Sequence, residues 1–408
     1  MHAATWNPQA RALAFRLKTQ YFLVFAPFAI AVTYQNLHFR RLGFSDREIG
    51  TLGAVGAVLS VVSPLLWGYV TDRVRDRRIP LAFLLAASGL AYLPFLMARS
   101  YRAALVLQVL FSFFMAPCVA LTDALVLEHL PQAGGDYGRI RLWGSLGFIV
   151  TLLGVGLFLG GGPLGGAPAS GEAGATGLTL TFVAFAVARA LSMAWVFRLP
   201  RGAQTGPPRE TYREGMAGLF RDRAFLLLLG SSFLVQTGLR AYYVFFSIYL
   251  DSLGIGDSYK GVFWSIGVVS GTAFMVVAGS LLRRVGVRWT LVLGMAGGAL
   301  RLLLFSFPLP VAAVGLAQSL HALAFGASHI ATVTFIRASV PNRLRATGQT
   351  LYAAVTGGLA GAVGSRLAGD LSDALGLALA FRYCALLAAI AAAAAAWLPE
   401  RRDVEDDA

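Results

Sequence analysis

Long apolar runs recur along the whole chain and restrict the fold more than any other feature. Each run holds about 18 residues or more, enough at 1.5 Å per residue for a helix to cross the ~30 Å hydrocarbon core of a bilayer. Of the 408 residues, 57% are hydrophobic and 13% are charged. Soluble domains carry about 25% charged residues. The runs therefore predict an all-α polytopic membrane protein.

The runs predict twelve transmembrane helices in two pseudo-symmetric bundles of six. Polar, Gly and Pro residues between the runs mark the helix ends. The predicted spans are 16–39, 46–70, 79–98, 103–129, 140–160, 178–198, 223–249, 258–282, 288–307, 310–336, 346–368 and 377–398.

Two of the predicted loops differ in composition from the others. Residues 160–177 are rich in Gly, Pro and Ala, which is typical of a flexible linker. Residues 200–222 are polar and basic and contain two consecutive prolines, so they separate the two bundles. We predict an N-terminal bundle over residues 1–199, a cytoplasmic central loop over 200–222, and a C-terminal bundle over 223–408 with a short acidic tail.

The net charge of +14 comes from cations placed between the apolar runs rather than on one basic face. This placement argues against nucleic acid as a partner and favours membrane lipid. Most of the cations share a predicted membrane side with the N-terminus, and cytoplasmic loops are the ones enriched in Lys and Arg. We predict a bacterial-type cytoplasmic (inner) membrane with both termini in the cytoplasm. Cys118 and Cys384 lie inside apolar runs and are expected to be free thiols.

The two halves of the sequence repeat each other in a constant register. After a shift of 211 positions, glycines and charged residues coincide through a loop, a helix and the next loop. Two similar halves related by an axis along the membrane normal are typical of transporters with a site between the halves. The matched pairs include Gly43 and Gly254, Asp46 and Asp257, Gly50 and Gly261, Gly68 and Gly279, and Arg73 and Arg284.

Charged residues interrupt the two apolar runs between residues 117 and 148. Asp123 and Glu128 lie on the first run, and Arg141 and Trp143 open the second. A charge in hydrocarbon is costly unless it is paired or faces water, so these residues are functional candidates. We predict that Asp123 and Arg141 form a pair in the substrate site, with a purely structural ion pair between two helices as the alternative.

Polar residues also follow one face of the predicted helix 310–336. His321 and His329 could relay protons, since histidine titrates near pH 6.5; neutral histidines bonded to neighbouring helices are the alternative. We expect no metal and no cofactor, because the two histidines do not converge and no Cys, Asp or Glu joins them. The face consists of Gln318, His321, Phe325, Ser328, His329 and Thr332.

Three more arginines lie in predicted membrane helices with few acids to pair with them, namely Arg189, Arg240 and Arg301. A buried unpaired guanidinium is costly, so an anionic substrate would supply the missing partner. Arg189 or Arg240 could instead face water or extend its charge to the interface. Tyr34 and Trp143 are aromatic candidates for binding the same substrate.

A charged loop, GYVTDRVRDRR, follows the second predicted helix from Gly68 onward. Gly68 permits close backbone approach, Asp72 can pair or cap, and Arg73 and Arg77 can meet helix C-termini or lipid phosphates. Basic charge that only sets orientation is the alternative reading. The Gly-x-x-x-Asp-Arg spacing resembles the loop signature of the major facilitator superfamily, which implies a gating role for this loop.

The strings LTDAL and DYGRIRLWGS, between residues 121 and 145, closely resemble the phenylpropionic acid transporter family of that superfamily. This family is similar in turn to oligosaccharide–proton symporters such as lactose permease. The strings AYYVFFSIY, WSIGVVS, QSLHALAFGASHIA and RATGQTLYAA match as well, so the resemblance spans nearly the whole chain. It implies the major facilitator fold.

The resemblance also implies roles for individual residues. Asp123 and Arg141 would hold the substrate in the first half, while Arg301 and His321 would form the second-half side of the site. Arg240 is added to the predicted substrate site as one of the membrane arginines with few acids to pair with, not through the resemblance.

The sequence departs from the family at a position that bears on proton coupling. The family usually has a glutamate on the eighth helix, where this chain has Ser270 and Gly271. The second half therefore lacks its expected proton-carrying carboxylate, and coupling could be absent. The remaining candidates for proton coupling are Asp123, Glu128, His321 and His329.

We therefore expect a monomeric secondary active transporter that works by alternating access. The expected reaction is proton-coupled uptake of a small organic acid, with the aromatic acid 3-phenylpropionate as an example. A sugar or nucleoside proton symporter is one alternative, and a drug or metabolite exporter is another. An enzyme is not expected, because the sequence offers no nucleophile–base set and no metal-ligand cluster.

Overall fold

The computed structural model describes residues 8–134, 136–159, 172–201 and 219–400. Within these residues, eleven helical stretches are long and apolar enough to cross a membrane. Most of the predicted linker 160–177, most of the predicted central loop 200–222, and the acidic tail lie outside the described residues.

Most helices of the first half begin and end within a few residues of the predicted positions, but α1 begins at Pro8 instead of residue 16 and α7 begins at Glu172 instead of residue 178. Pro117 divides the fourth predicted span, because a proline lacks the N–H that would continue the helical ladder. The first six spans correspond to α1 (Pro8–Arg41), α2 (Asp46–Thr71), α3 (Arg78–Tyr92) with η1 (Leu93–Met97), α4 (Tyr101–Met115) with α5 (Pro117–Ala133), α6 (Tyr137–Leu159) and α7 (Glu172–Val196).

The second half also contains six spans. The first of them, α9, has Asp222 as its N-cap, and the Asp222 carboxylate accepts hydrogen bonds from the backbone N–H groups of Ala224 and Phe225. The six spans correspond to α9 (Arg223–Ser252), α10 (Asp257–Val285), α11 (Val287–Phe305), α12 (Val311–Ser319) with the π-helical η2 (Ala322–Ala327) and α13 (Ser328–Ser339), α14 (Arg345–Ala353) with the π-helical η4 (Ala354–Leu359) and α15 (Ala360–Leu375), and α16 (Leu377–Ala395). A short 3₁₀ turn, η3 (Asn342–Leu344), precedes α14.

The predicted helix 346–368 is present as α14, η4 and α15, but it is not among the eleven apolar stretches. The observed helix extends beyond the predicted end, to Leu375 of α15, and carries Arg366, Asp370 and Asp373 in its last turns. Each of these three side chains has an ion-pair partner. The charged residues that make this helix less apolar therefore form contacts within the protein.

The chain forms two compact units. Unit 1 comprises Met1–His38, Leu59–Gly206 and Gly256–Ser265, and unit 2 comprises the rest. The first residues of α2 therefore belong to unit 2, although the remainder of that helix belongs to unit 1. The first residues of α10 belong in the same way to unit 1.

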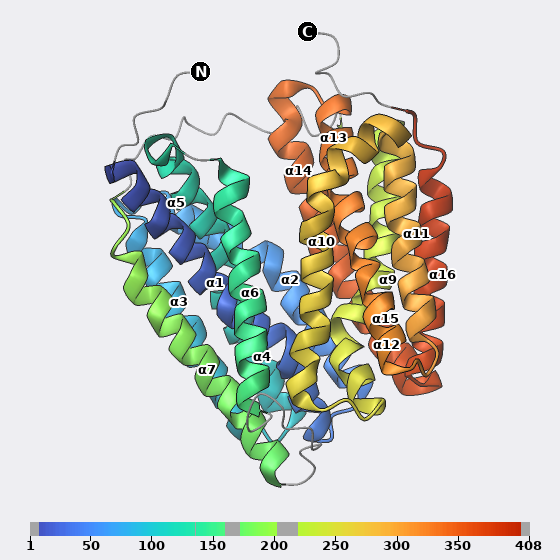
Figure 1. The fold of residues 1–408 in the computed structure, drawn as a ribbon, viewed down its shortest axis with the longest axis horizontal. Helices are drawn as coiled ribbons and strands as arrows, with labels where there is room; N and C mark the ends of the chain where they lie inside the picture. Colours follow the sequence, from blue (N-terminus) through green and yellow to red (C-terminus); the bar gives the residue numbers. More distant parts are fainter. Residues whose placement is uncertain (1–7, 135, 160–171, 202–218, 401–408) are drawn as a thin grey trace. The chain divides into compact units, whose positions relative to one another are not determined.

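In unit 1, α3 and α7 lie side by side (Figure 1). Leu81, Leu84 and Leu85 of α3 form a buried cluster with Cys118 and Leu125 of α5. Between α6 and α1, a Cβ at Gly147 would collide with the backbone of Phe22, so only glycine permits that approach.

In unit 2, α9, α11 and α16 run side by side, and α15 packs against α9 (Figure 1). A Cβ at Gly364 of α15 would collide with the carbonyl of Thr237 in α9. The α15–α9 contact thus has the same form as the α6–α1 contact of unit 1, which agrees with the repeat seen in the sequence.

The turns before α2 and α10 confirm the register of that repeat. Gly43 and Gly254 both have positive φ, +85° and +73°, a conformation that glycine adopts without a steric penalty. The helices that follow start at Asp46 and Asp257, which were matched in the sequence.

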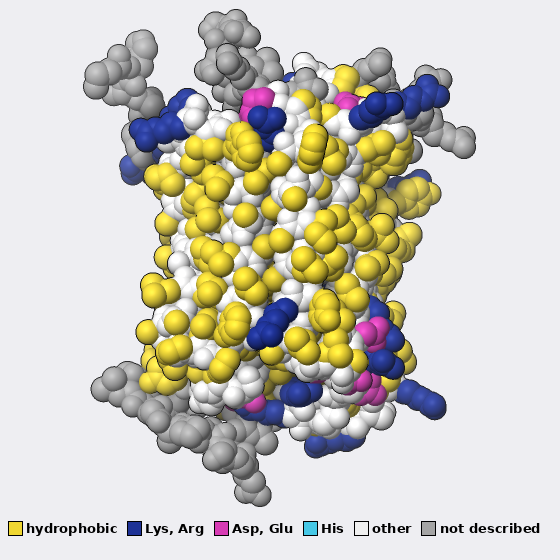
Figure 2. Space-filling model, turned by 90° about the vertical axis from the view of Figure 1, so that its right-hand side faces the viewer, with side chains coloured by type: hydrophobic (Ala, Val, Ile, Leu, Met, Phe, Trp, Pro, Cys, Tyr) yellow, Lys and Arg dark blue, Asp and Glu magenta, His cyan; other side chains and the backbone are white. Residues whose placement is uncertain are grey.

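Hydrophobic side chains cover the middle of one face of the molecule, and charged side chains gather toward its two ends (Figure 2). This distribution matches a bilayer, whose apolar core lies between two polar interfaces.

Candidate functional site

A fully buried arginine and a histidine form the centre of the polar cluster in unit 2. Arg301 of α11 is 0% exposed, and its Nη1 lies 2.8 Å from Nδ1 of His321, just before η2. Because a guanidinium only donates, the Nδ1 atom accepts and the imidazole is neutral in this arrangement. The Nε and Nη2 atoms of Arg301 are buried and have no hydrogen-bond partner in the described structure.

An aromatic ring and an amide complete this cluster. The Arg301 guanidinium carbon lies 3.9 Å from the ring centroid of Tyr242 in α9, within cation–π range. Gln318 of α12 donates to the Tyr242 hydroxyl at 2.6 Å. Three helices therefore fix the cluster, and Tyr242 and Gln318 supply groups that can bind hydroxyls or a carboxylate.

Glycines of α10 lie against the same histidine. A Cβ at Gly271 would lie 3.4 Å from His321 Cδ2, and a Cβ at Gly267 would lie 3.2 Å from Gln318 Nε2. The family glutamate that the sequence analysis found replaced by Ser270 and Gly271 would therefore lie beside His321. Here that position offers space and no carboxylate.

His321, Phe325 and His329 form a stacked column. The ring centroids are 5.4 Å apart for the first pair and 5.7 Å for the second, and the planes are nearly parallel. The π-helical turn η2 lies between the two histidines, and π-helical turns often occur at functional sites. His321 is in the buried cluster, whereas His329 is exposed.

In unit 1, a tyrosine lies where the sequence analysis expected a direct pair. The Tyr21 hydroxyl of α1 donates to Asp123 Oδ1 at 2.5 Å. The Arg141 guanidinium lies over the Phe25 ring at 4.1 Å and over the Tyr21 ring at 5.5 Å. Tyr21 thus connects Asp123 to Arg141. The sequence analysis missed Tyr21, and only the i, i+4 spacing of Tyr21 and Phe25 gave a signal for it.

The two aromatic candidates have protein partners. Tyr34 is 0% exposed, and its hydroxyl donates to the Asp257 carbonyl at 3.3 Å within unit 1. Trp143 is exposed and lies beneath the Lys18 ammonium, 5.8 Å from the ring centroid. In this structure Tyr34 is therefore part of the packing and Trp143 part of the surface.

The other two membrane arginines differ from each other. Arg240 of α9 donates to the Gly357 carbonyl of η4 at 3.1 Å, and its Nε is buried without a partner. Arg189 of α7 is 1% exposed and contacts Met115, while its Nε and Nη1 have no hydrogen-bond partner among the residues that the structure describes.

The loop after α2 contains linked ion pairs. Arg77 lies 3.6 Å from both Asp72 and Glu128, so Glu128, a candidate for proton coupling, is held by the loop. Arg73 lies over the ring of Tyr69. A Cβ at Gly68 would meet nothing within 4 Å, so the close approach expected at this glycine is not present here.

The described residues contain no group of three or more His, Cys, Asp or Glu side chains that could hold a metal ion. The cysteines Cys118 and Cys384 are free and buried.

Membrane-spanning helices in two repeated units, with charged side chains clustered inside each unit, define a secondary transporter of the major facilitator superfamily. The chain belongs to the MFS_1 like family, whose sequence model matches residues 14–383. It is an integral membrane protein that moves a small molecule by alternating access.

Several relatives are similar to this chain over most of their length. The maltose permease of Geobacillus stearothermophilus is 30% identical, with 88% of this chain and 86% of the relative covered. The probable 3-phenylpropionic acid transporter of Escherichia coli (strain K12) is 27% identical, covering 87% and 90%. The solved structure of the nucleoside transporter NupG superposes with a TM-score of 0.80 at 19% identity, covering 94% of this chain and 98% of that one.

Proposed function

We propose that this transporter takes up a small organic acid together with protons. It would act in the cytoplasmic membrane of a bacterial-type cell, with both termini in the cytoplasm. The observation that carries the proposal is the buried Arg301 guanidinium, two of whose nitrogen atoms have no hydrogen-bond partner within the described part of the chain. A buried, uncompensated charge is costly, and a carboxylate offers two acceptor atoms that fit a guanidinium edge.

The proton is proposed to bind at His321. The neutral ring accepts from Arg301, so protonation would remove that hydrogen bond and place two cations 2.8 Å apart. A substrate carboxylate beside Arg301 would offset this repulsion. Substrate anion and proton would therefore favour each other's binding, which is the coupling that a symporter needs.

In unit 1, Asp123, Tyr21 and Arg141 are proposed to orient the rest of the substrate. Arg141 is held by an aromatic face rather than by a carboxylate, which leaves its fork available to an acceptor on the substrate. The likeness to a probable 3-phenylpropionic acid transporter supports an aromatic acid.

The test is uptake of labelled 3-phenylpropionate into proteoliposomes, with and without an inward proton gradient. Accumulation driven by the gradient, lost in Arg301→Gln, is the expected result. Arg382→Gln is the matched control, since Arg382 is an arginine of unit 2 held by Ser306 and the Phe307 ring. Absence of uptake by folded, inserted protein would reject 3-phenylpropionate as the substrate.

A sugar or a nucleoside is the second candidate, as a proton symport substrate. It is favoured by the 30% identity to a maltose permease and by the hydroxyl-binding Gln318–Tyr242 pair. The same vesicles, given labelled maltose or uridine, separate the two candidates.

A further inference from the structure

Two arginines and a tryptophan connect the start of α1 to the end of α7 in unit 1. Arg16 donates through Nη1 to the Arg198 carbonyl at 3.2 Å, and the Trp195 indole N–H donates to the Arg16 carbonyl at 3.1 Å. The Arg198 guanidinium carbon lies 5.2 Å from the centroid of the Trp195 ring. We call Arg16, Trp195 and Arg198 the α1–α7 cation site.

The two arginines of this site are exposed, and neither has an acidic partner among the residues that the structure describes. The carboxylate of Asp76, before α3, is already used by other cations. Its Oδ2 lies 2.7 Å from Arg78 Nη2 and 3.7 Å from Arg201 Nε. The α1–α7 cation site therefore has an excess of positive charge that Asp76 does not balance.

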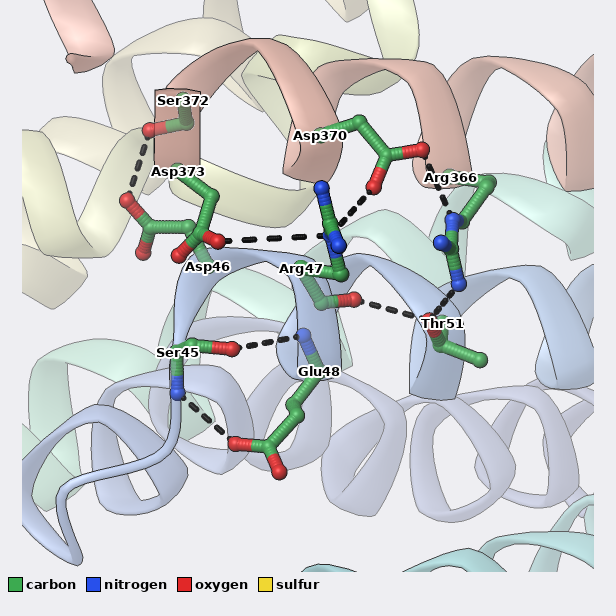
Figure 3. A network of polar contacts seen from close by, with 9 residues as sticks. All are labelled: Ser45, Asp46, Arg47, Glu48, Thr51, Arg366, Asp370, Ser372 and Asp373. Carbon is green, nitrogen blue, oxygen red and sulfur yellow. Dashed lines mark hydrogen bonds and ion pairs between the residues drawn. The ribbon is translucent and has the colours of Figure 1, made fainter. Parts of the chain in front are cut away.

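Exposed arginines in unit 2 show a different arrangement. Arg47 Nε lies 2.8 Å from Oδ1 of Asp370, and Arg366 Nε lies 2.8 Å from Oδ2 of the same carboxylate (Figure 3). The acid occupies both guanidinium groups there. The guanidinium groups of the α1–α7 cation site remain available to an anion from outside the protein.

The depth of the α1–α7 cation site matches that of lipid head groups. The predicted apolar spans 16–39 and 178–198 begin at Arg16 and end at Arg198, so both residues mark the boundary between apolar and polar sequence. Phe15 and Phe197, beside them in the chain, are 60% and 54% exposed. Tryptophan is enriched at the level of the head groups, and arginine extends its charge toward them. Exposed rings next to exposed cations suit a ligand that has both an acyl chain and a charged head.

We propose that the α1–α7 cation site binds the head group of an anionic phospholipid. The phosphate would accept hydrogen bonds from Arg16 and Arg198, and the acyl chains would lie along Phe15 and Phe197. A phosphodiester has two non-bridging oxygens, to which a guanidinium can donate two parallel hydrogen bonds. Basic pockets between transmembrane helices are known to bind anionic lipid head groups. Contact with Trp195 restricts the Arg198 side chain, which reduces the entropy lost on binding.

The experiment uses the full chain in detergent and no transported solute, so its outcome is independent of the organic-acid proposal. Native mass spectrometry measures the apparent Kd for phosphatidylglycerol and for phosphatidylcholine with the same acyl chains. We expect phosphatidylglycerol to bind at least about fivefold more tightly, the factor that one arginine contributes near an anionic lipid surface. Inorganic phosphate at the same concentration should not displace the lipid, because it has no acyl chains. Displacement would assign the site to a free anion and overturn the proposal.

Arg16→Gln and Arg198→Gln are each expected to weaken phosphatidylglycerol binding about fivefold and to leave phosphatidylcholine binding unchanged. Glutamine at position 16 keeps an N–H donor for the Arg198 carbonyl, so the contact between the helices can persist. Arg16→Lys keeps the charge and loses the planar fork, so its affinity should lie between those of the wild type and Arg16→Gln. Arg139→Gln is the matched control, since Arg139 is an exposed arginine of unit 1 at the start of α6.

Thermal unfolding without added lipid establishes that each variant is folded. Equal affinities of the wild type for the two lipids would overturn the proposal. So would an unchanged affinity for phosphatidylglycerol in Arg16→Gln and Arg198→Gln, as expected if the two arginines only join the helices. An equal loss in Arg139→Gln would show that the effect comes from the overall charge and not from this site.

Discussion

The Tyr21 hydroxyl lies 2.5 Å from Asp123 Oδ1, and the Tyr21 ring lies 5.5 Å from the Arg141 guanidinium carbon. One tyrosine therefore connects the acid and the arginine that the sequence suggested would meet directly. If Asp123 orients the substrate, its position depends on this hydroxyl.

Replacing Tyr21 with phenylalanine removes the hydroxyl and keeps the ring. Because a hydrogen bond to a charged group contributes about 1.5–3 kcal/mol, we expect KM for the transported solute to rise roughly tenfold or more. The measurement is initial uptake rate against concentration in proteoliposomes. Tyr92→Phe is the control, since the buried Tyr92 hydroxyl has no hydrogen-bond partner in the described residues. Equal effects of the two substitutions would contradict this role for Tyr21.

Arg141→Lys keeps the charge but removes the planar guanidinium that stacks on Phe25. We expect uptake to fall at least about tenfold with the fold intact, which corresponds to about 1.4 kcal/mol. Uptake and thermal unfolding are measured on the same preparations. Arg139→Lys, an exposed position two residues earlier, should behave as wild type. Near-normal uptake by Arg141→Lys would remove Arg141 from the site.

His321→Gln replaces the titrating ring with a side chain whose carbonyl can still accept from Arg301. We expect solute exchange to continue while accumulation driven by a proton gradient is lost. His329→Gln should keep both activities, because His329 is exposed and outside the Arg301 cluster. The reverse pattern would assign the proton to His329.

Alanine substitutions at two glycines of α6 distinguish the effect of close helix packing on stability from the effect of intrinsic helix propensity. A Cβ at Gly147 would collide with the Phe22 backbone, whereas a Cβ at Gly154 would meet nothing within 4 Å. We expect Gly147→Ala to destabilise the protein by about 1–3 kcal/mol and Gly154→Ala to stabilise it by up to about 1 kcal/mol. Thermal unfolding in detergent measures both, and equal melting temperatures would contradict the close α6–α1 contact.

Asp76 lies before α3, and its carboxylate accepts from Arg78 at 2.7 and 2.9 Å. The hydrogen bonds from Arg78 lower the pKa of the Asp76 carboxyl below its usual range. A lowered folded-state pKa adds stability above the ordinary pKa of about 3.9, and this stability is lost as pH falls through the folded value. Asp76→Asn should therefore cost about 1 kcal/mol at pH 7 and progressively less in acid. A difference independent of pH would show that the charge is not responsible.

The helices could be predicted from the sequence to within a few residues at most ends, as at 46–70 against Asp46–Thr71 and 223–249 against Arg223–Ser252. Hydrophobic length and helix-ending residues are local properties, and a bilayer imposes helical structure on any apolar span. The repeat could be recognised in the sequence for the same reason, because Gly43 and Gly254 each occupy a local turn that favours glycine.

The partners of the polar residues could not be predicted in this way. The sequence indicated that Arg301 and His321 belong together only through a family resemblance, and it assigned Asp123 to Arg141 without Tyr21. The pairing of Arg47 with Asp370, more than 300 positions away, left no signal in the sequence.

A twelve-helix membrane transporter with two similar halves follows from the amino-acid sequence, because length, apolarity and periodic glycines act within each helix. The charged groups that meet one another are known from the folded structure alone. Those contacts depend on helix rotation and on close approach at positions such as Gly147 and Gly364, where packing brings distant segments together.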